Sequence, residues 1–145
     1  MGGGDFRVVV RARPTEHTRT NPSRARPNRH DDARLKIKEN QVEAALHDEL
    51  GPGPTYAFAF DDAIDAHETQ ERVYQRAARP AVQSLLKGFN ASLIAYGHTG
   101  AGKTYTMEGG PADQGGIAPR AFAEVFDHIR SSRFDAPTRF LVRAS

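Results

Sequence analysis

The sequence predicts an α/β fold with a central, mostly parallel sheet, helices on both faces of that sheet, and a small antiparallel flap. Three observations lead to this prediction. Residues 6–14 and 91–96 are short apolar runs, typical of buried strands. Residues 65–88 and 117–132 place apolar side chains at helical spacing. The second apolar run leads directly into a glycine-rich motif. Strands that alternate with helices favour parallel pairing.

The first half of the chain is predicted to contain strands joined by loops. The run "FRVVVRARP" stops at Pro14, and residues 15–33 are polar and read as a long loop. Residues 34–40 and 56–60 alternate apolar residues with polar or small ones, as half-buried strands do. Residues 50–54, "LGPGP", are interpreted as the turn between these two strands, which together form the flap.

The stretch from 65 to 88 predicts one helix or two stacked helical segments. Asp65 and Glu68 have the spacing of a capping pair, and Gly88 is a suitable stop. Pro80 is expected to kink or break the helix, because proline lacks the N–H of an internal hydrogen bond.

The last third of the chain predicts a strand, a motif and a further helix. Residues 91–96, "ASLIAY", are expected to form a fully apolar strand. Residues 117–132 form the helix, with Pro119 in its first turn. Residues 138–145 have the pattern of another strand.

Composition describes a soluble globular chain and excludes several classes of site. Of the 145 residues, 26% are charged, and the formal net charge is only +2, too small to indicate a nucleic-acid partner. With no cysteine there is neither a disulfide nor a thiolate zinc site. No apolar run is long enough to cross a membrane, and the N-terminus does not resemble a signal peptide. The arginines between Arg19 and Arg34 read as a solvated loop or as a contact for an acidic partner.

The motif "GHTGAGKT" has the complete pattern of a phosphate-binding loop. Its glycines allow backbone N–H groups to turn toward a phosphate, and a following helix would direct its positive end at the same anion. Lys103 is predicted to reach the β- and γ-phosphates, and the Thr104 hydroxyl to ligate Mg²⁺. The predicted nucleotide contacts are Gly97, His98, Thr99, Gly100, Ala101, Gly102, Lys103 and Thr104.

An enzyme with such a loop also needs an acid for the metal. Asp61 and Asp62 end the apolar run that starts at Tyr56, which is the pattern of a strand that ends in a metal-binding acid. They lie before the loop, in the flap, so the preferred interpretation is that they begin a turn and favour the N-terminus of the next helix.

Blocks around the motif resemble the kinesin motor domain. These are "VVVRARP", "YAFAFDDAI" with "TQERVY", "GFNASLIAYGHTGAGKTYTMEG" and "GGIAPRAFAEVFDHI", in that order. The resemblance covers residues 6–145 and implies the N-terminal portion of such a domain, preceded by a flexible end at residues 1–5. The fold it implies is that of a P-loop NTPase of kinesin type, truncated.

The resemblance implies that ATP with Mg²⁺ binds at the loop, with Lys103 and Thr104 as the catalytic groups visible here. Arg11, Arg13 and Pro14 match the segment that lies against the adenine; arginine and proline both offer flat faces to a base. Tyr105 matches a residue that lies near the adenine. The alternatives are surface charge for the two arginines and core packing for Tyr105.

His98 stands where the family usually has Gln. A charged imidazole there would bring a cation near the phosphates, which leads to the hypothesis that ATP affinity rises as pH falls.

The resemblance implies microtubules as the partner, contacted through parts of the motor that these 145 residues do not contain, and a cytoskeletal, cytoplasmic location. No nucleic-acid or membrane partner is expected. The family's switch motifs are also absent from these residues. We therefore expect nucleotide binding without turnover. The alternatives are a non-motor fragment or decoy without ATPase activity, or another P-loop NTPase.

Overall fold

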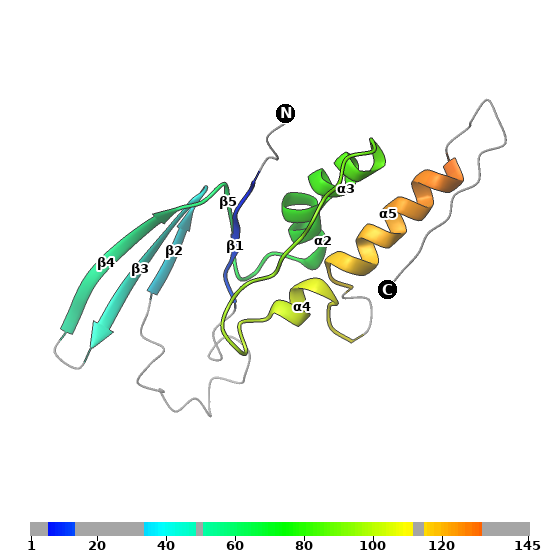
Figure 1. Ribbon diagram of the computed structural model, residues 1–145. Helices are drawn as coiled ribbons and strands as arrows, with labels where there is room; N and C mark the ends of the chain where they lie inside the picture. The colour runs from blue at the N-terminus through cyan, green and yellow to red at the C-terminus, as the bar shows by residue number, and fades with distance from the viewer. Residues whose placement is uncertain (1–5, 14–33, 49–50, 112–114, 132–145) are drawn as a thin grey trace. The chain divides into compact units, whose positions relative to one another are not determined.

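The computed structural model describes residues 6–13, 34–48, 51–111 and 115–131. The chain divides into two compact units, the first ending at Thr69 and the second beginning at Gln70. Figure 1 labels the strands and the α-helices of both units.

Three sequence predictions lie outside the described residues. They are the flexible end at 1–5, the loop at 15–33 and the last strand at 138–145. These stay predictions.

The first unit contains a pair of parallel strands. β1 (Val9–Arg11) pairs with β5 (Asp62–Ile64), and Val10 lies opposite Ala63. Ala63 and Ile64 are buried, as expected for apolar residues in a strand at the centre of a core. Parallel pairing, as predicted for the sheet, is present, but the partner of β1 is β5, which sequence analysis did not predict as a strand, and only these two of the described strands share this sheet.

Asp61 and Asp62 fasten the chain just before β1. The Val8 N–H donates to the Asp61 carboxylate over 2.6 Å, and the Arg7 guanidinium donates to Asp62 over 3.2 Å. These bonds give both carboxylates a structural role within the first unit.

The predicted antiparallel flap is present and has three strands. β2 (Arg34–Lys38), β3 (Gln41–Asp48) and β4 (Gly51–Ala59) lie in sequence order, with β3 in the middle (Figure 1). Sequence analysis missed β3, because its Glu, Ala and Asp residues have low strand propensity. Pairing on both sides stabilises it as a strand nevertheless.

Two turn assignments in the flap need correction. The predicted strand over 34–40 ends at Lys38, and Glu39, with φ of 51°, begins a two-residue turn to β3. The predicted turn at 50–54 is wrong, since β4 already begins at Gly51. Proline 54 is tolerated there because β4 pairs with β3 alone among the described strands, and an edge strand does not need every N–H.

The second unit begins with a continuous helical stretch. It consists of α2 (Gln70–Val73), the π-helical turn η1 (Tyr74–Ala78) and α3 (Arg79–Leu86). The helix starts five residues later than residue 65, so the predicted capping pair is wrong. The Asp65 carboxylate instead accepts the His67 N–H over 3.0 Å in the preceding turn.

Pro80 produces the predicted irregularity as a π-helical turn. The Arg79 N–H donates to the Tyr74 carbonyl, five residues back. Proline has no N–H, and its ring would clash with the carbonyl four residues earlier, so a wider turn relieves the crowding. The helical stretch then ends at Leu86, and Gly88 adopts φ of 93°, as its predicted role as a stop requires.

Two further helices complete the second unit. α4 (Lys103–Met107) follows the predicted phosphate loop, and α5 (Ile117–Ser131) has Pro119 in its first turn, as predicted. Side chains of α2, η1 and α3 pack with α5 to form the core of this unit: Val73, Tyr74, Ala78, Val82 and Ile117 are all buried.

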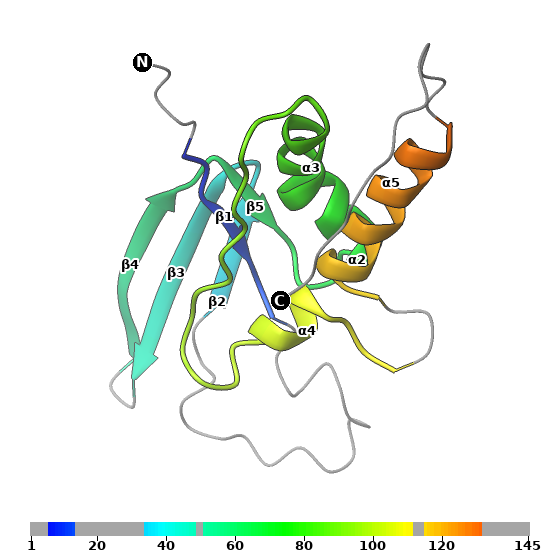
Figure 2. The same cartoon turned by 45° about the vertical axis from the view of Figure 1, so that its right-hand side comes forward.

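The predicted strand at 91–96 is wrong for the residues described. Figure 2 shows this stretch without a strand arrow, between α3 and α4. Ile94 is 87% exposed and Tyr96 is 98% exposed. A strand requires neighbours for its N–H and C=O groups, and no described strand pairs with this segment. The third strand expected in the parallel sheet is therefore absent from the described part of that sheet.

Candidate functional site

The phosphate loop, Gly97–Thr104, holds the Lys103 ammonium against its own backbone. The Lys103 Nζ donates to the Gly97 carbonyl over 2.9 Å and to the His98 carbonyl over 2.8 Å. An ammonium has three N–H donors. Two of them orient the group across the start of the loop, and the third has no partner among the described residues.

The glycines in the loop adopt conformations that other residues avoid. Gly102, directly before α4, has φ of 95°, in the left-handed region. Gly97 has φ of 153°, and a Cβ added there would lie 3.0 Å from the Ala101 Cβ. The Ala101 N–H donates to the His98 carbonyl over 3.1 Å and closes a turn. The backbone is thus folded tightly, with no side chain filling its concave side at Gly97.

The His98 ring is tied to the same loop. Its Nδ1 lies 2.6 Å from the Thr99 carbonyl oxygen. A carbonyl only accepts, so Nδ1 must carry the hydrogen, and the Nε2 of the neutral ring is then an acceptor. The ring is exposed, so a change in its charge would be felt at the loop surface.

Thr104 is exposed at the start of α4, beside Lys103. Its hydroxyl is the kind of oxygen ligand that Mg²⁺ accepts, and Mg²⁺ commonly keeps waters and substrate phosphates as its other ligands. The described residues contain no group of three or more His, Asp or Glu that could hold a metal. The Thr104 hydroxyl fits one ligand of a Mg²⁺ ion that takes its other ligands from phosphates and water.

The predicted adenine contacts lie in different units. Arg11 ends β1 and the exposed Arg13 follows it, both in the first unit, while Tyr105 is half-buried in α4 of the second. Pro14 lies outside the described residues. A role of these residues at the base stays a prediction.

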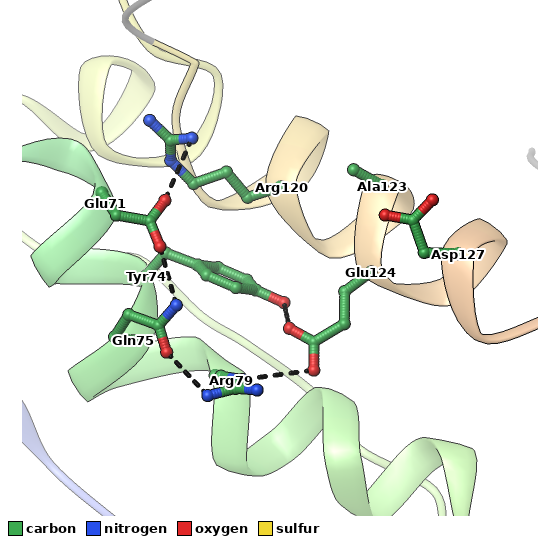
Figure 3. A pocket seen from close by; sticks show the side chains of 8 residues that line it. All are labelled: Glu71, Tyr74, Gln75, Arg79, Arg120, Ala123, Glu124 and Asp127. Carbon is green, nitrogen blue, oxygen red and sulfur yellow. Dashed lines mark hydrogen bonds and ion pairs between the residues drawn. The ribbon is translucent and has the colours of Figure 1, made fainter. Parts of the chain in front are cut away.

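A second constellation joins the helical stretch to α5, and we call it the Tyr74 cluster (Figure 3). The buried Tyr74 hydroxyl donates to the Glu124 carboxylate over 2.6 Å, and the Arg79 guanidinium contacts the same carboxylate over 3.3 Å. Arg120 pairs with Glu71 over 3.4 Å. Burial raises the pKa of the Tyr74 hydroxyl far above its usual value, and the hydrogen bond to Glu124 raises that pKa further.

The Tyr74 cluster borders a shallow hollow of about 360 Å³. Figure 3 shows the Tyr74 ring lying between the two helical elements, with most polar groups of the cluster bonded to one another. The buried Nε of Arg120 has no hydrogen-bond partner among the described residues. Since the carboxylates and guanidinium groups largely neutralise one another, the arrangement is that of a structural link between helices.

Sequence analysis did not single out the Tyr74 cluster or the buried Gln70, whose side chain reaches the carbonyl of Tyr105. The partners in these contacts are 35 to 50 positions apart in the chain. A helical pattern shows that Tyr74 faces the core, but it carries no signal for which carboxylate the hydroxyl meets.

No helix in the described part of the chain is sufficiently long and apolar to span a membrane.

Comparison with known proteins places the motif in a family. The sequence profile of the kinesin motor domain matches residues 11–145. Kinesin-like protein klp-20 of Caenorhabditis elegans is 39% identical over 155 residues, which cover 99% of this chain and 21% of klp-20. Kinesin-like protein KIF3C of Bos taurus is 46% identical over 90 residues, which cover 61% of this chain and 11% of KIF3C. The chain thus matches about a fifth or less of the length of these relatives.

Proposed function

Because this chain belongs to the kinesin motor domain family, we propose that it is the ATP-binding part of a motor that moves along microtubules. The observation that carries the proposal is the Lys103 ammonium, fixed by the carbonyls of Gly97 and His98 with one donor to spare. A fixed cation beside a glycine-rich backbone is suited to the β- and γ-phosphates of a nucleotide.

In the proposed mechanism, the loop positions the nucleotide and stabilises negative charge. Lys103 binds the β- and γ-phosphates, and the backbone from Gly97 to Gly102 surrounds them. Thr104 would hold Mg²⁺, which when bound neutralises phosphate charge. In this proposal the adenine is contacted by Arg11, Arg13, Pro14 and Tyr105. Asp61 and Asp62 remain structural, because their carboxylates already bond Val8 and Arg7.

The 145 residues alone are proposed to bind ATP with Mg²⁺ without turning it over. They contain no sequence like the family's switch motifs, which sense the γ-phosphate and carry the metal-linked acid. Microtubule contact belongs to other parts of a kinesin motor in this proposal, and a microtubule-associated location follows from it.

Isothermal titration calorimetry of the purified chain tests the proposal. We expect binding of ATP in the presence of Mg²⁺ and much weaker binding of AMP, which lacks the β- and γ-phosphates. Equal affinity for ATP and AMP would contradict the role of the loop. Microtubule-stimulated ATP hydrolysis by the same 145 residues would contradict the proposed lack of turnover.

A further inference from the structure

Helix α4 carries both Lys103 and Thr104 but is too short to hold its own position. It has five residues, Lys103–Met107, and none of its residues is fully buried. Isolated helices of this length are unstable, because nucleating a helix costs more free energy than a few hydrogen bonds recover. Its orientation must therefore be set by contacts with other elements.

One such contact comes from Gln70, the first residue of α2. Gln70 is only 6% exposed, the one buried polar residue among the described residues, and its Nε2 donates to the Tyr105 carbonyl over 2.7 Å. Burying an amide is costly unless its hydrogen bonds are made. This bond therefore joins α2 to the residue that directly follows Thr104.

The helical stretch that carries Gln70 is itself held by contacts within the second unit. The neighbouring Val73 and Tyr74 are buried in the core of the second unit. Glu71 pairs with Arg120 of α5, and the Tyr74 hydroxyl binds Glu124 of α5. Because this helical stretch is fixed, the Gln70 side chain cannot easily move with α4, and its bond resists a shift of α4.

The far end of α4 meets the start of α5. The Gly116 N–H donates to the Glu108 carbonyl over 3.0 Å. A Cβ on Gly116 would lie 2.6 Å from the carbonyl oxygens of Thr106 and Met107, so the two backbones touch there. This contact fixes the end of α4 next to the start of α5, and the Gln70 bond holds its middle.

We propose that Gln70 is a positioning residue that orients Lys103 and Thr104 toward the phosphates and the metal by holding the Tyr105 carbonyl. The inference rests on the proposed nucleotide binding and deepens it. Gln70 does not touch the nucleotide. It acts through α4, so its loss is felt most where the geometry is strictest, at the joint contact of Thr104, Mg²⁺ and phosphate.

The test compares Gln70→Met, which keeps the length of the side chain but removes the donor, with Gln75→Met as a matched control. Gln75 lies on the same helical stretch and bonds only Glu71 and Arg79 among the described residues. ATP binding is titrated with Mg²⁺ and again with EDTA. We expect Gln70→Met to weaken Mg²⁺-dependent binding about tenfold, with a much smaller change in EDTA, and Gln75→Met to change neither.

Hydrogen exchange of the nucleotide-free chain provides a second readout. We expect faster exchange at the amides of 103–108 in Gln70→Met than in Gln75→Met. Wild-type exchange at these amides, or an equal loss of ATP affinity with and without Mg²⁺, would overturn the inference in favour of a purely structural glutamine. If the wild-type chain does not bind ATP with Mg²⁺, the proposed function fails instead, and hydrogen exchange alone decides whether Gln70 anchors α4.

Discussion

The phosphate loop and the Tyr74 cluster both order charged side chains in the second unit, but with different partners. In the cluster, the guanidinium groups of Arg79 and Arg120 meet the carboxylates of Glu124 and Glu71. In the loop, Lys103 meets only backbone carbonyls among the described residues. A carboxylate cancels a positive charge, whereas a carbonyl is a neutral dipole that orients the charge and leaves it in place.

This difference supports the proposal that the nucleotide binds at the loop and not at the Tyr74 cluster. Charges that neutralise each other between two helices stabilise the contact between those helices and attract little else. A cation held by neutral groups at an exposed loop keeps its attraction for an anion.

Replacing Lys103 by Ala tests the comparison most directly. We expect the affinity for ATP with Mg²⁺ to fall by at least about a hundredfold, because a charge-assisted contact to two phosphates is lost. The free energy of unfolding in urea should change little, since the partners of Lys103 lie at an exposed loop. Arg79→Ala should show the reverse pattern, a lower stability with an affinity within about twofold of wild type. Similar behaviour of the two variants would remove the distinction between the regions.

Replacing Gly116 by Ala tests whether the backbone contact between Gly116 and the end of α4 stabilises the fold. The added Cβ would lie 2.7 Å or less from three backbone atoms, so we expect a loss of about 2 kcal/mol in the free energy of unfolding. Gly88→Ala is the matched control. Gly88 has a left-handed φ, which Gly116 does not, but it has open space around it, so about 1 kcal/mol is expected there from the backbone conformation alone. Urea denaturation followed by circular dichroism measures both, and a smaller loss at Gly116 than at Gly88 would count against the contact.

Replacing Tyr74 by Phe removes the hydroxyl from the cluster and keeps the ring. At neutral pH we expect a loss of about 1 kcal/mol in the free energy of unfolding, with ATP affinity unchanged. Burial and Glu124 raise the pKa of Tyr74 in the folded chain. The stabilisation of the fold by the Tyr74 hydroxyl is therefore complete below about pH 10, where the tyrosine of the unfolded chain is still neutral. It is lost as pH rises further, since only the unfolded tyrosine then ionises readily. Unfolding curves between pH 7 and 11 should show the two proteins converging, and a constant difference would contradict this.

The smallest effect is expected at His98, which adds a titratable group to the phosphate loop. The ring bonds the Thr99 carbonyl through Nδ1, and the His98 carbonyl bonds the Lys103 ammonium, so protonation adds a second cation at the loop. We expect ATP affinity to rise about threefold between pH 8 and pH 6, and His98→Gln to reduce that rise. The Gln variant is needed as a control because ATP itself takes up protons in this range. Identical pH profiles for the two proteins would refute the hypothesis.

Sequence analysis predicted the elements whose signals are local. The helix over 117–131, its early proline and the irregularity at Pro80 each depend on neighbouring residues, and each is present. Strands β1, β2 and β4 are present for the same reason, because runs such as Val8–Val10 favour strands in most surroundings, whereas β5, the parallel partner of β1, was not predicted. Errors arose where pairing decided the outcome. Strand β3 forms because it has a neighbour on each side, whereas residues 91–96 pair with no described strand.

Residue types at fixed spacing were sufficient to identify the phosphate motif, its glycines, and the family to which the chain belongs. The folded arrangement was needed to show which groups hold Lys103, that Gln70 reaches the Tyr105 carbonyl, and that Tyr74 meets Glu124. Those contacts join side chains to groups elsewhere in the fold. A pattern of residues states what each group can bond, but packing determines which groups come within 3 Å of each other.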